Sequence, residues 1–88
     1  MMNGVYVLQS IKNKRYYIGS TDNIERRMKQ HNSGYVSSTK NIMPLKLVLF
    51  QKCDTLADAR KLERKIKNFK RRDFIEKMIK DGRIIVGP

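Results

Sequence analysis

The amino-acid sequence predicts a small α+β fold with the element order β-β-α-β-α-α. Three short runs rich in β-branched, aromatic and aliphatic residues fall at 4–10, 16–20 and 45–50. Between and after them, three segments carry apolar residues at helical spacing. The 88 residues show no internal repeat, low-complexity segment or interdomain linker, so residues 1–88 are expected to form a single domain.

The first two strands are expected to form a hairpin. The β-prone run 4–10 ends before a polar stretch, and the run 16–20 follows that stretch directly. A third strand is expected at 45–50, which is apolar on both alternating faces apart from Lys46. Such a pattern is typical of a strand covered on both sides, and it predicts that this strand is central in the sheet.

The first helix is expected over 23–32, with Thr21 or Asp22 as its cap. At about 100° per residue, Arg27 and His31 fall in the same arc as the apolar residues of this helix. The polar segment that follows the helix, up to Met43, carries Tyr35 and Lys40. It has the character of a segment that contacts a substrate.

Two further helices complete the expected fold. One begins at a capping pattern formed by Thr55 and Asp58, and its apolar face includes Glu63. The last is expected around 73–80 and ends before a glycine. The tail at 84–86 is either a last edge strand or a frayed end.

The composition is strongly basic. Twenty Lys and Arg against eight Asp and Glu give a net charge of +12 at pH 7, more than solubility needs. This charge indicates a polyanionic partner, with nucleic acid first and a merely solvated basic protein as the alternative. The sequence shows no apolar run of ~18 residues and no leader with a cleavage site, so we expect a cytoplasmic protein that does not bind membranes.

Three ionisable side chains occupy positions where a thin core favours apolar ones: Arg27, His31 and Glu63. Burying an unpaired charge is costly, so each of them needs a partner, a metal ion or a wet cleft. An internal ion pair between Glu63 and Arg27, or exposure at the edge of the helices, explains these positions as well as a functional site does. Periodicity alone leaves these alternatives open.

An ordered set of motifs resembles the signature of GIY-YIG nucleases. The Gly-Val-Tyr run at 4–6 and the Tyr-Ile-Gly run at 17–19 match its two halves. Members of that family carry an arginine ten positions after the second tyrosine, a histidine one turn later and a glutamate on a later helix. Arg27, His31 and Glu63 match these positions, so the resemblance covers nearly the whole chain.

The resemblance implies a three-stranded antiparallel sheet flanked by helices, with the active site on the sheet face. It also implies hydrolysis of DNA phosphodiester bonds with one divalent cation, Mg²⁺ or Mn²⁺, bound by Glu63. Tyr6 is then the general base that takes a proton from the attacking water, which makes activity rise with pH. Arg27 stabilises charge on the phosphate. Tyr17 holds the phosphate or the water, and His31 hydrogen-bonds a tyrosine or aids the leaving group.

Further basic residues are expected to bind the DNA backbone. They are Arg26, Lys40, Arg60, Lys67 and Lys70. Two departures from the family pattern concern the leaving group: a lysine that some relatives carry three positions after the second tyrosine is Ser20 here, and an asparagine beyond the glutamate has no clear match. Lys67 or Lys70 could substitute for the lysine.

The sequence therefore predicts a metal-dependent DNA endonuclease, and leaves open a structure-specific role in DNA repair or recombination. The rival hypothesis is a basic nucleic-acid-binding module that keeps the fold without cleavage, which the missing lysine and asparagine favour. Both predict salt-sensitive DNA binding, so metal dependence is the property that separates them. We expect no added targeting domain in these 88 residues, so a protein partner is one way of choosing a target. No small-molecule cofactor is expected.

Overall fold

A computed structural model of the chain describes residues 3–69 and 71–84. The elements along the chain are β1 (Gly4–Ser10), β2 (Tyr16–Thr21), α1 (Ile24–Asn32), the 3₁₀ turn η1 (Lys40–Ile42), β3 (Leu45–Lys52), α2 (Leu56–Phe69) and α3 (Arg72–Asp81). This order confirms the predicted α+β fold. The predictions for Lys70 and for tail residues 85 and 86 fall outside the described residues.

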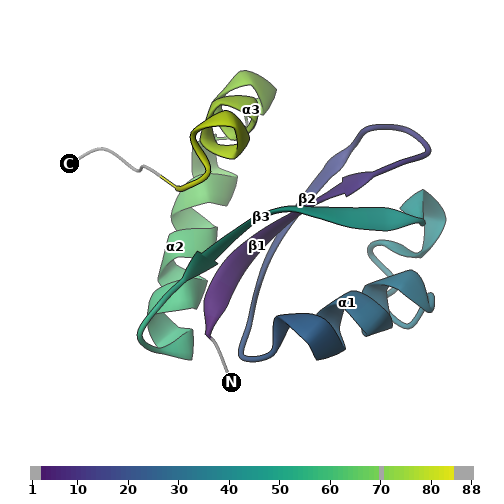
Figure 1. Cartoon of the computed structure of the whole chain (residues 1–88), viewed down its shortest axis with the longest axis horizontal. Helices are drawn as coiled ribbons and strands as arrows, with labels where there is room; N and C mark the ends of the chain where they lie inside the picture. Colours follow the sequence, from purple (N-terminus) through teal and green to yellow (C-terminus); the bar gives the residue numbers. More distant parts are fainter. Residues whose placement is uncertain (1–2, 70, 85–88) are drawn as a thin grey trace.

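The three strands form one antiparallel sheet with the order β2-β1-β3 (Figure 1). β1 pairs with β2 from Gly4 opposite Thr21 to Gln9 opposite Tyr16, and with β3 along its other side. This confirms the three-stranded antiparallel sheet. The prediction that the third strand is central is wrong, because β1 occupies the centre and β3 is an edge.

Helices on both faces of the sheet explain why β3 is apolar on alternating sides. α1 lies against one face, and α2 and α3 lie against the other (Figure 1). Leu45 of β3 packs in the cluster on the α1 side, whereas Leu49 packs in the cluster with α2 and α3. Leu47, by contrast, is 41 % exposed. Apolar residues on both faces of a strand indicate that both faces are covered. They do not indicate whether the strand has a neighbour along both of its edges, which is what makes a strand central.

The sheet thus separates two apolar clusters. The cluster beneath α2 and α3 has as its buried members Val5, Val7, Ile18, Leu49, Ala59, Ile66 and Met78. Tyr6, Leu8 and Leu45 are the buried members on the α1 side, and Tyr17 packs against them. Because side chains alternate along a strand, neighbouring residues of β2 face opposite helices. Tyr17 of β2 therefore faces α1, whereas Ile18 faces α2 and α3. Because β2 is an edge strand, side chains from both faces can meet the same surface there.

Side-chain caps define where α1 and α2 begin. Asn23 caps α1 by accepting a hydrogen bond from the backbone N–H of Arg26. The prediction of Thr21 or Asp22 is therefore wrong by one or two residues. Thr55 caps α2 as predicted. Within the described residues, no helix is both long enough and apolar enough to cross a membrane.

Candidate active site

Tyr6 lies at the centre of a buried polar cluster on the α1 face of the sheet. It is only 1 % exposed, and its hydroxyl lies 2.9 Å from His31 Nε2. Arg27 donates from Nε to the same hydroxyl oxygen at 3.2 Å. α1 carries Arg27 and His31 one turn apart, which places both side chains toward the sheet as the helical spacing predicts. The Tyr6 cluster consists of Tyr6, Tyr17, Arg27 and His31.

The direction of the hydrogen bonds through His31 follows from which groups can donate. Arg27 can only donate, so of the two groups that contact the Tyr6 hydroxyl, His31 Nε2 is the one that accepts its proton. The imidazole proton then lies on His31 Nδ1, which donates to Thr39 Oγ1 at 2.7 Å. Thr39 in turn donates to the carbonyl of Val36 at 3.4 Å. The result is a directed chain of hydrogen bonds from Arg27 to Val36.

Burial is the largest influence on the pKa values of Tyr6 and His31, and it favours the neutral form of both. Desolvation, followed by the nearby Arg27 charge, lowers the pKa of His31 to about 4, so its imidazole is neutral at physiological pH. Desolvation also raises the pKa of Tyr6, although the hydrogen bond and the charge of Arg27 act in the opposite direction. Tyr6 is therefore a neutral phenol in the folded protein, with its proton already directed at a neutral histidine.

The buried neutral state of His31 predicts a loss of stability in mild acid. In the unfolded chain the imidazole binds a proton below pH 6.5, whereas in the folded chain it does so only near pH 4. The unfolded state therefore binds more protons in this window, and the free energy of unfolding should fall by up to about 3 kcal/mol as pH drops through it. Urea denaturation from pH 7 to pH 5 measures this slope. A His31→Gln variant with the same slope would show that another group causes it.

Tyr17 completes the cluster from the neighbouring strand. Its ring centroid lies 6.4 Å from that of Tyr6 and 5.1 Å from that of His31. The hairpin register places Leu8 opposite Tyr17 and Gly19 opposite Tyr6, so the two tyrosines are diagonal neighbours on one face. The predicted hairpin therefore brings the two tyrosines side by side.

Gly19 is needed because the Tyr6 ring lies directly over it. A Cβ at this position would overlap the ring carbon Cζ and the hydroxyl of Tyr6. We expect Gly19→Ala to displace the phenol and to lower the free energy of unfolding by about 1–3 kcal/mol. Chemical denaturation of Gly19→Ala in the wild-type and Tyr6→Leu backgrounds tests the cause, because the penalty should shrink once the ring is removed. An equal penalty in both backgrounds would assign the glycine to some other constraint.

Glu63 approaches the same strand from the opposite face of the sheet. Its Oε1 accepts a hydrogen bond of 2.6 Å from Ser20 Oγ, and its Oε2 forms an ion pair of 2.7 Å with Lys67 Nζ, one turn along α2. The alternative of an ion pair between Glu63 and Arg27 is therefore wrong. The Glu63 side chain is 22 % exposed and its lysine partner is more so, which means that the carboxylate is paired but not sealed from solvent.

Two hollows adjoin around β2 and connect these groups. The arginine hollow has a volume of about 370 Å³ and is lined by Ser20, Thr21, Asp22, Arg26, Arg27, Gln30, Leu56 and Arg60. The glutamate hollow has a volume of about 500 Å³ and is lined by Ser20, Arg60, Glu63, Arg64, Lys67 and Asn68. Because Ser20 and Arg60 line both hollows, Arg27 and Glu63 open onto neighbouring parts of one basic surface.

The residues predicted to bind DNA are distributed unevenly over this surface. Arg60 lines both hollows, and Lys67 lines the glutamate hollow. Arg26 lines the arginine hollow, although its guanidinium also forms an exposed ion pair of 2.6 Å with Asp22. Lys40 is exposed in η1, on a different segment from the hollows.

Three further residues of the site were not predicted. Arg64 lies one turn after Arg60 on α2, and that spacing could have revealed it. Ser20 was noted only for standing where relatives have a lysine, yet its hydroxyl holds the Glu63 carboxylate. Thr39 had no signal in the sequence, because its contact with His31 arises from the path of the loop after α1.

Comparison with known proteins assigns the family. A family model described as the GIY-YIG catalytic domain matches residues 2–78. The chain belongs to the GIY-YIG family. This membership indicates a nuclease, and GIY-YIG nucleases are generally dependent on divalent metal ions.

Similar proteins come from several bacteria. A UPF0213 protein of Syntrophus aciditrophicus (strain SB) is 38 % identical over 76 residues, which cover 84 % of this chain and 86 % of the relative. A UPF0213 protein of Clostridium perfringens (strain 13 / Type A) is 36 % identical over 76 residues, with 85 % and 81 % covered. One of Listeria welshimeri is 36 % identical over 69 residues, with 77 % and 76 % covered. No solved structure matches the chain.

The donor groups of the site fit a cation that needs few protein ligands. Within the described residues, no group of three or more His, Cys, Asp or Glu side chains could hold a metal ion. A cation would therefore depend on Glu63 together with water and substrate phosphate, which is a common arrangement for Mg²⁺. Ser20 fixes one carboxylate oxygen, and the other carries the Lys67 ammonium. The second oxygen, Oε2, therefore already has a positively charged partner in this structure, and a metal ion would take the place of that ammonium.

Proposed function

We propose that this GIY-YIG protein is a metal-dependent endonuclease that hydrolyses DNA phosphodiester bonds. The observation that carries the proposal is the arrangement around β2, where Arg27, bonded to the buried Tyr6, and the Glu63 carboxylate open onto adjoining basic hollows. Hydrolysis of a phosphodiester needs an activated water, neutralised charge on the phosphate and a stabilised leaving oxygen. Arg27 and Glu63 bring groups for charge neutralisation to the two hollows, and the Tyr6 hydroxyl contacts Arg27 at 3.2 Å.

Arg27 is the group that stabilises the phosphate. Its Nε donates to Tyr6 and its Nη1 donates to Gln30 Oε1 at 3.0 Å, so two contacts fix the plane of the guanidinium. The hydrogen bond with Tyr6 raises the pKa of Arg27, which keeps it charged. A held guanidinium loses little entropy when it binds phosphate oxygens, and it presents its remaining donors to the arginine hollow.

Tyr6 is the group that receives the proton of the attacking water. As the water oxygen bonds to phosphorus, the bond from phosphorus to the leaving oxygen breaks, and that oxygen takes a proton from solvent. The proton of the attacking water moves to the Tyr6 hydroxyl, and the phenolic proton moves along the existing hydrogen bond to His31 Nε2. His31 Nε2 can accept this proton because it already faces the phenol, with the other ring nitrogen donating to Thr39. Its lowered pKa of about 4 means that it holds the proton only briefly before releasing it. This relay avoids a free tyrosinate, which the raised pKa of Tyr6 disfavours. Tyr17 closes the site beside both rings.

Glu63 is the proposed metal ligand. A bound Mg²⁺ or Mn²⁺ supplies positive charge that stabilises the phosphate and the leaving oxygen. Ser20 orients the carboxylate, and Lys67, released from Glu63, pairs with a DNA phosphate in the same hollow. Some relatives carry a lysine at the position of Ser20. Lys67, which contacts the same carboxylate as Ser20, provides a basic group near that position from α2.

The substrate is proposed to be recognised by its shape. The cations of the two hollows are suited to phosphates, which position a protein on DNA without specifying sequence. We therefore propose a structure-specific activity of the kind used in DNA repair or recombination. A protein partner that recruits the chain to its target is compatible with this surface.

A non-catalytic nucleic-acid-binding module is the second candidate, and the ion pair of Glu63 with Lys67 favours it. Incubation of supercoiled and branched DNA with Mg²⁺, Mn²⁺ or EDTA separates the two functions, with binding measured in parallel by fluorescence anisotropy. The nuclease predicts nicking with either metal, no nicking with EDTA, and binding in all three conditions. Salt-sensitive binding without cleavage under any condition would establish the binding module.

A further inference from the structure

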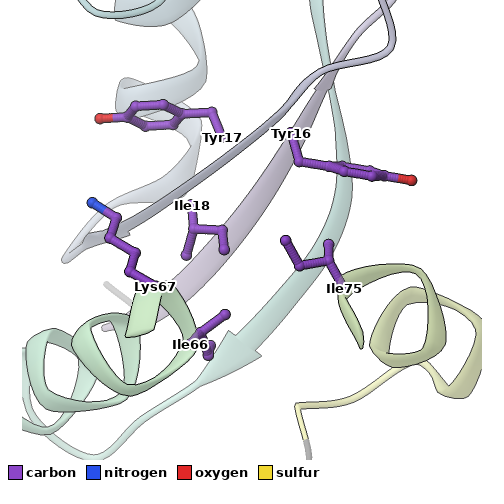
Figure 2. A pocket seen from close by; sticks show the side chains of 6 residues that line it. All are labelled: Tyr16, Tyr17, Ile18, Ile66, Lys67 and Ile75. Carbon is purple, nitrogen blue, oxygen red and sulfur yellow. The ribbon is translucent and has the colours of Figure 1, made fainter. Parts of the chain in front are cut away.

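A third hollow lies at the exposed edge of β2, beside the glutamate hollow. This tyrosine pocket has a volume of about 250 Å³ and is lined by Tyr16, Tyr17, Ile18, Ile66, Lys67 and Ile75. Figure 2 shows the two tyrosines projecting from β2 in opposite directions, with Ile18 between them. Side chains from α2 and α3 complete the pocket, so three elements of the fold build it.

The lining of the tyrosine pocket suits a flat ring system. Ile18 and Ile66 are almost fully buried and give it an apolar floor, and the two tyrosines give it aromatic sides. At ~30 Å³ per water molecule, its volume corresponds to roughly eight waters, which is room for one small ring system and its immediate surroundings. The polar groups of its lining residues are two phenols and one ammonium.

Each aromatic side of the pocket has a cation beside it. The Arg72 guanidinium lies over the Tyr16 ring at 4.7 Å from its centroid, and Lys67 Nζ lies over the Tyr17 ring at 5.8 Å. Lys67 also lines the glutamate hollow and contacts Glu63. A chain of alternating phosphates and rings laid across β2 would therefore place a phosphate near Glu63 and a ring at the pocket.

We propose that the tyrosine pocket binds the base of one unpaired nucleotide in the DNA strand that crosses the site. Aromatic surfaces flanked by cations are what proteins use to bind single-stranded nucleic acid, because every base has a face that can stack. A base that is paired and stacked inside a duplex cannot enter the pocket. The inference rests on the proposed function for the phosphate position, and it makes unpaired DNA the preferred substrate.

Binding without cleavage tests the pocket directly. Two duplexes with a one-nucleotide bulge are compared by fluorescence anisotropy in EDTA, one with a normal bulged nucleotide and one with an abasic analogue at the same place. The two duplexes have the same backbone shape and charge, so any difference between their affinities is due to the bulged base. We expect the normal bulge to bind on the order of tenfold tighter, consistent with the stacking of one base. Equal affinities would overturn the proposal.

Two variants from different elements assign the preference to the pocket. Tyr16→Leu removes an aromatic side, and Ile75→Trp fills the space from α3. Each should bring the two affinities within about twofold of each other by weakening binding of the normal bulge, while binding of the abasic duplex stays unchanged. Leu47→Ala is the matched control, because Leu47 is 41 % exposed on β3, at the opposite edge of the sheet, and lies outside the pocket. Loss of the preference in Leu47→Ala, with its retention in both pocket variants, would place the base elsewhere.

Cleavage of the same bulged duplex with Mg²⁺ is scored separately. A tenfold base preference without cleavage would support the pocket and contradict the nuclease. Cleavage with no base preference would support the nuclease and overturn the pocket. The two proposals therefore fail by different observations.

Discussion

Replacing Glu63 with glutamine should slow metal-dependent DNA cleavage by about a thousandfold while leaving DNA binding in EDTA nearly unchanged. Glutamine has the same size and can still accept the hydrogen bond from Ser20. It lacks the negative charge that pairs with Lys67 and that would hold a divalent cation. The fold should therefore survive, and the loss should be confined to catalysis.

The rate of nicking with Mg²⁺ under enzyme excess measures this effect. Glu25→Gln is the matched control, because Glu25 is an exposed carboxylate in the first turn of α1 that lines neither hollow. It should cleave at the wild-type rate. A Glu63→Gln protein that also cleaves at the wild-type rate would remove Glu63 from the catalytic site.

Replacing Tyr6 with phenylalanine should slow cleavage by roughly 10²–10⁴-fold, the usual contribution of a positioned acid–base group. The change removes only the hydroxyl that connects Arg27 to His31. Both partners lose a buried hydrogen bond, so the free energy of unfolding should also fall by about 1–3 kcal/mol. The rate is measured at a temperature where the variant is fully folded, so that the change in rate reports catalysis and not unfolding. A folded Tyr6→Phe protein with near-normal cleavage would contradict the proton relay through His31.

Local sequence patterns predicted most of the fold because its elements bury their faces in regular ways. The strand runs, the helical spacing on α1 and the Thr55 cap of α2 are decided by residues near one another in sequence. The same spacing placed Arg27 and His31 toward the sheet, where the structure has them. Recognition of the motifs then supplied the antiparallel sheet.

The strand order was beyond the reach of these patterns. β3 is apolar on both faces because α1 covers one and α2 with α3 cover the other, and its edge position depends on which strand pairs with β1. The pattern of hydrophobic residues along a strand indicates whether its faces are covered, but not which strands pair with its edges. The N-cap of α1 was also misplaced, because Thr21, Asp22 and Asn23 are all good capping residues and backbone geometry decides among them.

The internal bonds of the site depend on contacts between distant parts of the chain. Tyr6 and His31 are 25 positions apart, and Ser20 and Glu63 are 43 apart. No local rule links such pairs. Ser20, which stands where some relatives carry a lysine, is therefore the residue that holds the candidate metal ligand, and Lys67 reaches the same carboxylate from α2.

If the Tyr6 cluster and Glu63, held on opposite faces of the sheet, act together in one metal-dependent nuclease site, removal of either should stop cleavage without releasing the DNA. The decisive measurement is first-turnover cleavage of one bulged DNA by wild-type protein, Tyr6→Phe and Glu63→Gln at equal DNA occupancy in Mg²⁺. We expect cleavage by the wild type alone on this time scale, with both variants bound to intact DNA. A wild-type protein that binds without cutting, or either variant cutting at the wild-type rate, would contradict this expectation.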